Sequence, residues 1–131
     1  TLQALKMDRG WTYLQVAYAQ PFDPAVVERH LEIFGDEVLQ HQDFARARGE
    51  AGTFGILLVR WTGEARQYEL IREIESQGGC KIFNPHVVTI EDGGMKTIDT
   101  QQIEFKKRSD PMGLMNPGKT RGWTPDMATE G

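Results

Sequence analysis

Residues 53–61 have the sequence Thr-Phe-Gly-Ile-Leu-Leu-Val-Arg-Trp, which is a nearly unbroken apolar run. Such a run is typical of a central strand that is covered on both faces or that meets a partner. Upstream, Trp11–Ala19 is rich in aromatic and apolar residues and predicts a second strand, which Pro21 ends. These two stretches are the predicted centre of the fold.

A helix is predicted between these two strands. Asp23 can accept a backbone amide hydrogen bond as the N-cap residue, and Pro24 suits the first helical position. Residues at three- and four-residue spacing then continue to about Leu39, namely Val27, His30, Leu31, Phe34 and Val38. This spacing puts them on one face of an amphipathic helix, which we expect to pack on the sheet.

A second helix is predicted from Gly63 to about Gln77, directly after the central strand. Thr62 can cap its start, and Gly78-Gly79 supplies the C-terminal stop. Its expected apolar stripe consists of Ala65, Tyr68, Ile71 and Ile74.

The remaining segments are predicted to be shorter or irregular. Residues 41–52 are polar or small and predict a loop. Residues 81–83 and 87–90 predict two short strands, interrupted by Asn84-Pro85, and residues 91–94 must turn.

A third helix is predicted near the C-terminus. Thr97 or Asp99 can cap its start, and Lys106-Lys107-Arg108 in its last turn favour the negative end of the helix dipole. Asp110-Pro111 ends it, because proline cannot donate the next backbone hydrogen bond.

The order of the predicted elements indicates an α+β fold. We expect a small antiparallel sheet with helices on one face, of the ferredoxin-like kind. Only two strands look substantial, so the sheet would have open edges. We therefore expect it to be completed by a second chain, as in a homodimer, or by sequence before Thr1.

Composition restricts the class of protein. The chain has 131 residues and a net charge of −4, whereas a nucleic-acid binder would normally present a basic face. No apolar run approaches the roughly 20 residues that span a membrane. No signal segment is recognised at the start, which makes a cytoplasmic location the expectation. Cys80 is the only cysteine and is expected to be a buried small hydrophobe.

The decapeptide Asp110–Lys119, Asp-Pro-Met-Gly-Leu-Met-Asn-Pro-Gly-Lys, carries most of the functional information. Its glycines and prolines predict a compact turn that holds Leu114 and Met115 inward. All ten residues together resemble the Asp-Pro-x-Gly-Leu-Leu-Asn-Pro-Gly-Lys ending of FAD-linked oxidases of the vanillyl-alcohol oxidase and D-lactate dehydrogenase type. Met115 stands where that family usually has leucine.

The segment that leads into the decapeptide extends this resemblance. Ile82–Arg108 looks like the corresponding segment of a bacterial and cyanobacterial branch of the same family, so the match runs from Ile82 to Trp123. Better-known members have Glu-His-Gly where this chain has Glu91-Asp92-Gly93. Only the glutamate and the glycine carry over, and the imidazole is absent.

The resemblance implies two-electron oxidation of a small hydroxylated or hydroxy-acid substrate at a flavin. FAD would be bound mainly by a glycine-rich domain that is not among these residues, so the chain alone would not be catalytic. Residues 1–109 would form a cap-like domain, and residues 110–131 a C-terminal tail facing the flavin domain. Asn116 and Lys119 are then the candidates for contacts near the cofactor.

Two residues are candidates for acid-base catalysis. His86 lies between Pro85 and an apolar pair, where a histidine is either a hydrogen-bonded core or edge residue or a base. Glu91 could be a general base or a turn residue. His30 and His41 lack a third ligand, so no metal site is predicted. The alternative to an enzyme part is a stand-alone homodimeric α+β binding or interaction module without catalysis.

Overall fold

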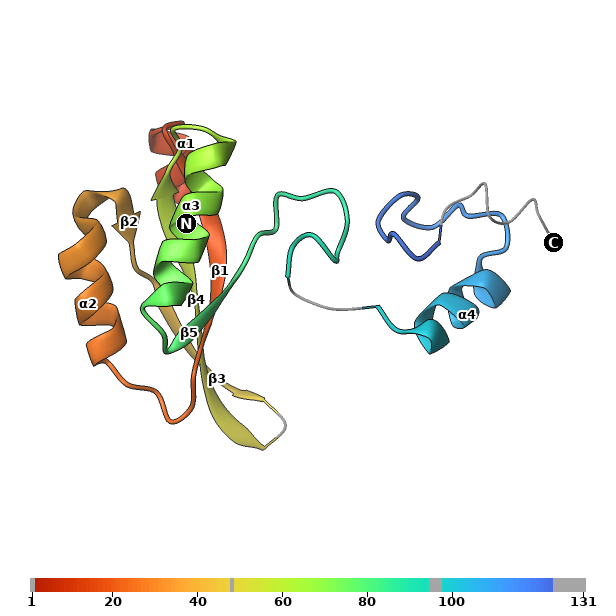
Figure 1. Cartoon of the computed structure of the whole chain (residues 1–131), viewed down its shortest axis with the longest axis horizontal. Helices are drawn as coiled ribbons and strands as arrows, with labels where there is room; N and C mark the ends of the chain where they lie inside the picture. The colour runs from red at the N-terminus through yellow and green to blue at the C-terminus, as the bar shows by residue number, and fades with distance from the viewer. Residues whose placement is uncertain (1, 48, 95–97, 124–131) are drawn as a thin grey trace. The chain divides into compact units, whose positions relative to one another are not determined.

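The computed structural model describes residues 2–47, 49–94 and 98–123. The chain forms two compact units, Thr1–Phe83 and Asn84–Gly131 (Figure 1). The boundary between a cap-like domain and a C-terminal tail, which the resemblance implied after residue 109, stays a prediction.

The first unit contains a five-stranded antiparallel sheet. Its strands are β1 (Trp11–Tyr18), β2 (Val38–Leu39), β3 (Gln42–Ala47), β4 (Glu50–Arg60) and β5 (Cys80–Phe83). The order is β2-β4-β1-β5, with β3 also paired to β4. In the register of β1 with β4, Leu14 lies opposite Leu57, so the two predicted central stretches are direct neighbours.

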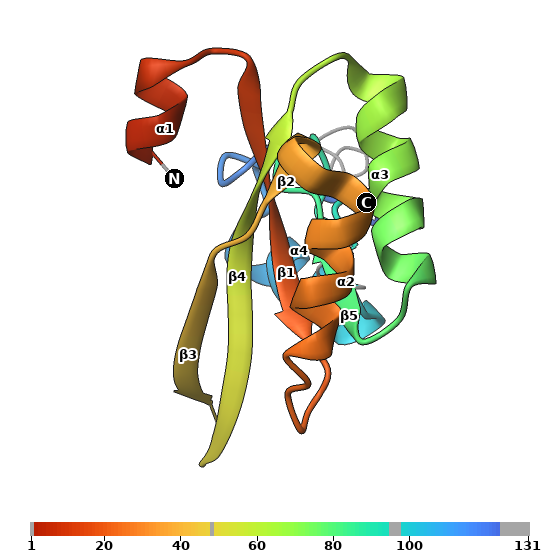
Figure 2. The same ribbon diagram turned by 90° about the vertical axis from the view of Figure 1, so that its left-hand side faces the viewer.

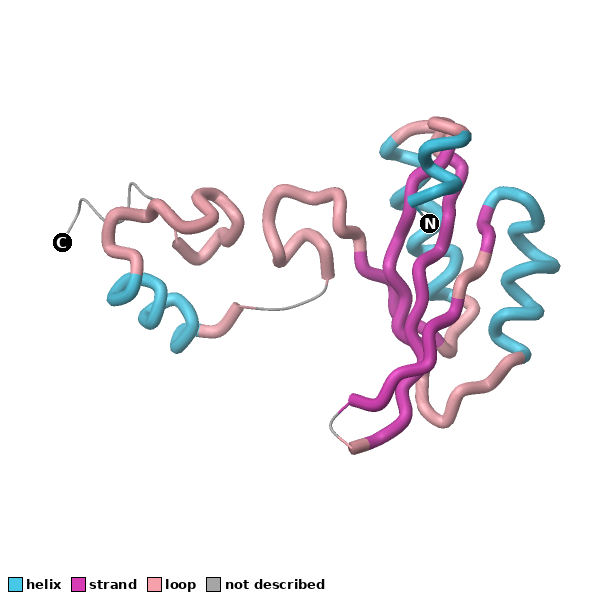
Figure 3. The backbone as a smooth tube through the Cα atoms, turned by 180° about the vertical axis from the view of Figure 1, so that it is seen from behind, coloured by secondary structure: helices cyan, strands magenta, loops and turns pink. Residues whose placement is uncertain are grey.

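Two helices cover one face of this sheet. Figure 2 shows α2 (Ala25–Phe34) and α3 (Glu64–Ser76) on the same side of the strands. The short helix α1 (Leu2–Met7) lies on the other side, as Figures 2 and 3 both show. The predicted α+β class, a small antiparallel sheet with its two main helices on one face, is confirmed.

The core of the first unit lies between the sheet and these two helices. Leu57 and Val59 of β4 are fully buried, whereas Ile56 and Leu58 between them are only half-buried. The central strand therefore alternates between two unequal faces instead of being buried on both. The buried apolar side chains that form the core are Leu14, Val16, Tyr18, Val26, Phe34, Val38, Leu57, Val59, Leu70, Ile74 and Ile82.

From β1 to β5 the elements follow the order β-α-β-β-α-β, when β2 and β3 are counted as one interrupted strand. This is the connectivity of the split βαβ motif. As a classification, the ferredoxin-like expectation stays a prediction.

The predicted loop at residues 41–52 is wrong, because this segment forms a hairpin. β3 pairs with the first half of β4, and Phe44 lies opposite Thr53. Gly49 has a φ of 88° in the tight turn between the two strands. Most residues of β3 have low intrinsic strand propensity, but β3 forms because it pairs with β4 along its length.

The first long helix ends earlier than predicted. α2 stops at Phe34, because Gly35 takes a φ of 49°. A 3-10 turn over Gly35–Glu37 follows, and Val38 then lies in β2 instead of on the helix. At the other end the N-cap position is occupied by Pro24 and not by Asp23, and no side-chain hydrogen bond is made at that cap. Asp23, one residue earlier, accepts the amide of Ala25 through Oδ1 at 3.0 Å.

The second long helix lies where the sequence predicted it, but its buried stripe is different. Gln67, Leu70 and Ile74 are buried, whereas Ala65 and Tyr68 are exposed. The predicted and the observed sets of residues both have helical spacings of three and four. The face that packs on the sheet is the one that contains Gln67. No side chain caps this helix, whose N-cap position is occupied by Gly63 and not by Thr62.

The second unit has one described helix, α4 (Thr100–Ser109), and is otherwise built from turns (Figure 3). Asp99 caps α4 by accepting the amide of Gln102 at 2.8 Å. The other predicted cap, Thr97, lies outside the described residues. The predicted strand at residues 87–90 is wrong, because these residues form bends and turns.

Among the helices that the structure describes, none has both the length and the apolar character needed to cross a membrane.

Candidate functional site

Residues 84–93 form a closed loop at the start of the second unit. The amide of Asn84 donates to the carbonyl of Gly93 at 3.0 Å, which joins the two ends of the loop. The Oδ1 atom of Asn84 accepts the amide of His86 at 3.0 Å, as in an Asx turn. A Cβ atom on Gly93 would lie only 2.8 Å from the carbonyl oxygen of Asn84, so the loop is tightly closed at this point.

The end of the decapeptide is hydrogen-bonded to this loop. The amide of Ile90 donates to the carbonyl of Lys119 at 3.0 Å. The amide of Arg121 donates to Oε1 of Glu91 at 3.0 Å, and the Arg121 guanidinium pairs with Asp92. Two stretches about 30 residues apart in sequence are therefore joined into one structure.

A pocket of about 180 Å³ lies between these two stretches. Its walls are mainly apolar, and one lining residue is charged. We call it the loop pocket; its lining consists of Asn84, Pro85, Val87, Val88, Thr89, Ile90, Gly93 and Lys119.

Of the two predicted cofactor contacts, Lys119 lines the loop pocket and Asn116 does not. Asn116 is exposed and has a φ of 50°, and its carbonyl accepts the amide of Lys119 at 3.3 Å. Asn116 thus forms the turn that presents Lys119 to the pocket.

The two predicted catalytic residues lie beside the loop pocket in sequence but do not line it. His86 is exposed. Glu91 is half-buried, and its Oε2 atom is buried without a hydrogen-bond partner among the described residues. Since Glu91 also holds the amide of Arg121, it has a structural role, and a role as a base stays a prediction.

The start of the decapeptide is organised around Asp110, which is 7 % exposed. Its carboxylate accepts a hydrogen bond from Lys106 Nζ at 2.8 Å. It also accepts hydrogen bonds from the backbone amides of Leu114 and Met115, at 2.8 and 3.0 Å. The Lys106 ammonium, followed by the two amide donors, holds the pKa of Asp110 below its ordinary value. We call Lys106, Asp110 and the two amides the carboxylate knot.

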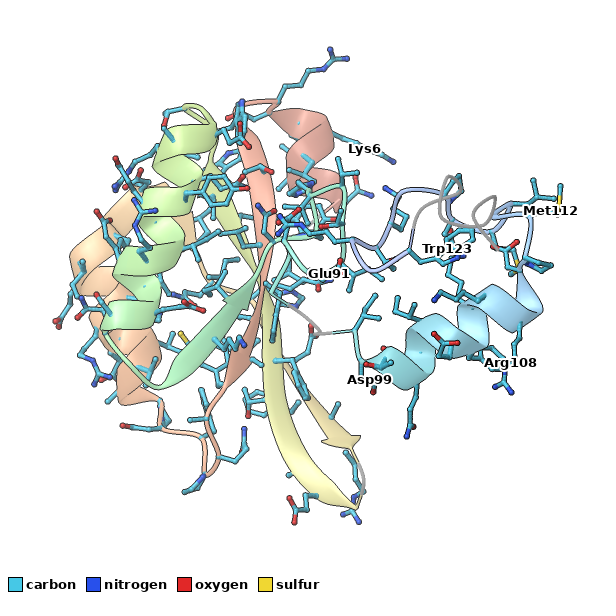
Figure 4. The ribbon with its side chains drawn as sticks, turned by 45° about the vertical axis from the view of Figure 1, so that its right-hand side comes forward. Lys6, Glu91, Asp99, Arg108, Met112 and Trp123 are labelled. Atoms are coloured by element: carbon cyan, nitrogen blue, oxygen red, sulfur yellow. The ribbon has the colours of Figure 1, made fainter. Side chains whose placement is uncertain are left out.

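In the carboxylate knot the amides of Leu114 and Met115 face the Asp110 carboxylate, whereas the apolar side chains of the decapeptide are exposed. Leu114 is 78 % and Met115 63 % exposed, so the prediction that both point inward is wrong. Met112 is exposed as well and points away from α4 in Figure 4. By contrast Trp123 is buried, and Lys106 Nζ lies 4.8 Å from the centre of its ring.

The side chains of the other two histidines and of the cysteine do not line the loop pocket. His30 is fully buried against Phe34 in the core of the first unit, and His41 is exposed near Asp43. No group of three metal-ligating side chains occurs among the described residues. Cys80 is half-buried and not buried as predicted, and this partial burial raises its pKa to about 11, which does not suit a nucleophile.

Several contacts of the site were not predicted from the sequence. Arg121, which links the loop to the decapeptide, was not among the predicted site residues, and Asp92 was predicted only as a turn residue or as the neighbour of a basic Glu91 carboxylate. Asn84-Pro85 was interpreted as an interruption between two strands, although Asn-Pro favours an Asx turn at the start of a loop. That dipeptide is the signal from which the closed loop could have been found.

Comparison with known proteins adds no family. No protein-family model matches the chain, and no curated protein is significantly similar to it.

Proposed function

We propose that this chain is the substrate-side and C-terminal part of a FAD-dependent oxidoreductase that acts on a small hydroxylated or hydroxy-acid substrate. The supporting observation is that the two stretches that resemble FAD-linked oxidases meet around one pocket. Ile90 is bonded to Lys119, and Glu91 to Arg121, so both stretches contribute to the same local structure.

The exposed side of the decapeptide supports the same proposal. Met112, Leu114 and Met115 are each more than 60 % exposed on a turn that the carboxylate knot holds in place. A fixed turn that presents apolar side chains outward suits a contact surface. In the proposed enzyme this surface meets the flavin domain.

The loop pocket is too small to enclose the whole cofactor. The loop pocket, at about 180 Å³, is smaller than the roughly 300–1,000 Å³ of pockets that enclose drug-sized ligands. FAD would supply the acceptor for the hydride, and its isoalloxazine and pyrophosphate would be held mainly by another domain. This chain would contribute part of the substrate surface, with His86 and Glu91 as candidate bases.

Flavin retention tests the proposal. The chain would be purified alone and together with the product of the reading frame directly upstream, then incubated with FAD and separated from excess cofactor by gel filtration. We expect visible flavin absorption only in the joint sample. A Leu114→Glu variant should weaken the association, whereas Met7→Glu, at a side chain that is 87 % exposed on α1, should not. Absence of flavin from both samples would refute the proposal.

A second candidate function is a homodimeric interaction module, favoured by the open sheet of the first unit. Among the described strands, β5 pairs only with β1, and β2 and β3 pair only with β4. Leu39 and Phe54 are exposed, and each follows a buried residue in its strand. Sedimentation of the purified chain distinguishes the two candidates, since a tight dimer without flavin would favour the module.

A further inference from the structure

The loop pocket combines apolar walls with a single cation. Val87, Val88 and Ile90 contribute the apolar side, and Lys119 is the one charged residue among the described residues of the lining. Three backbone and side-chain hydrogen bonds hold these walls together, at Asn84, Ile90 and Arg121. The pocket is thus preformed in the second unit alone.

The charges near the pocket leave Lys119 without a partner. Asp92 is engaged by Arg121 and by the hydroxyl of Thr89, and Glu91 accepts the amide of Arg121. The ammonium of Lys119 makes no ion pair or hydrogen bond with any residue in the part of the chain that the structure describes. Lys119 is exposed, and its ammonium beside apolar walls can form a charge-assisted hydrogen bond with an anion that also contacts those walls.

The volume limits the size of that anion. About 180 Å³ is below the roughly 300–1,000 Å³ of pockets that enclose drug-sized ligands, which suits a small anion. We propose that the loop pocket binds a short-chain monocarboxylate, with its carboxylate on Lys119 and its hydrocarbon chain against Val87 and Ile90. That this carboxylate is the substrate to be oxidised rests on the proposed function, whereas the binding itself does not.

Titration of the ¹⁵N-labelled full chain with butyrate, followed by NMR, tests this inference. We expect the amides of Val87–Ile90 and Gly93 to shift and saturate with butyrate but not with butyramide, which has the same size and no charge. Lys119→Met should weaken butyrate binding about tenfold or more, as expected for loss of a charge-assisted contact. Lys107→Met is the matched control and should have no effect, because Lys107 pairs with Glu104 on α4.

Several outcomes would overturn the inference. Equal shifts with butyramide would mean that the pocket selects only apolar bulk, and tighter binding of inorganic phosphate would identify a phosphate site. Unchanged affinity in Lys119→Met, or no saturable shifts in the loop, would exclude the proposed contact. Amide positions outside the loop report whether the variant is still folded. Flavin retention is measured separately, so failure of this inference is distinguishable from failure of the proposed function.

Discussion

The two units of this chain are stabilised in different ways. In Thr1–Phe83, eleven buried apolar side chains form one core between the sheet and two helices. In Asn84–Gly131 the most buried apolar side chain described is Trp123, and the other buried side chains include Asn84 and Asp110, both polar. The first unit is held by apolar burial, and the second by hydrogen bonds to fixed turns.

This difference indicates which unit depends on its surroundings. Burial of apolar surface contributes about 25 cal/mol per Å², whereas each intramolecular hydrogen bond contributes only about 1 kcal/mol net. The second unit has little apolar burial and exposes Met112, Leu114 and Met115. A segment of this kind opens locally at low cost unless something covers it, which fits the partner domain proposed above.

The largest expected difference between the unit held by apolar burial and the unit held by hydrogen-bonded turns is in the effect of a leucine-to-alanine substitution on the free energy of unfolding. Leu57 is fully buried in β4, so Leu57→Ala should lower the free energy of unfolding by about 2–5 kcal/mol through lost burial and a cavity. Leu114 is 78 % exposed, and Leu114→Ala should change it by less than about 0.5 kcal/mol. Urea unfolding followed by circular dichroism measures both. Similar losses in the two variants would show that Leu114 is covered in solution.

Acid should weaken the first unit through His30. This side chain is fully buried, and neither ring nitrogen has a hydrogen-bond partner among the described residues. Burial, and to a smaller extent the charge of Arg29, lowers the pKa of His30 below its ordinary 6.5. Below pH 6.5 the unfolded chain therefore binds a proton that the folded chain does not.

The resulting loss of stability is at most about 1.4 kcal/mol per pH unit, and it ends where the folded-state pKa is reached. Urea midpoints at pH 7.5, 6.0 and 5.0 should show this slope in the natural chain and a smaller one in His30→Leu. His41→Gln serves as the control, because the side chain of His41 is 55 % exposed. The same slope in His30→Leu would assign the acid sensitivity to other groups.

Sequence patterns predicted the first unit well where burial controls the structure. The apolar run at residues 53–61 and the aromatic stretch at 11–19 lie in adjacent strands, in which Leu57 and Leu14 are both fully buried. β3 was missed since its residues become a strand only through pairing with β4, which is a nonlocal effect. The stripe of α3 was misplaced because the sheet accepts the buried Gln67.

The site was less predictable, for a physical reason. Asp99, Asp110 and the prolines act on their immediate neighbours, so the ends of α4 could be predicted from the sequence. The loop pocket depends instead on contacts between residues about 30 positions apart, such as Ile90 with Lys119. No local pattern contains those contacts. The resemblance pointed to the two stretches, but it did not indicate that they meet.

The smallest expected effect is confined to the carboxylate knot of the second unit. Asp110→Asn should speed amide hydrogen exchange at Leu114 and Met115, because both amides donate to this carboxylate and the amide group of asparagine repels one of its donors. Exchange in β1 and β4 should be unchanged, since the knot belongs to the other unit.

In the natural chain the protection of these two amides should persist above the ordinary pKa of 3.8 and be lost as the pH falls through the lowered folded-state pKa of Asp110. Glu104→Gln, which breaks only an exposed pair with Lys107 on the same helix, should leave exchange at both amides as it is. If Asp110→Asn also speeds exchange throughout β1 and β4, the two units unfold together, and the contrast between a core-stabilised and a turn-stabilised half is wrong.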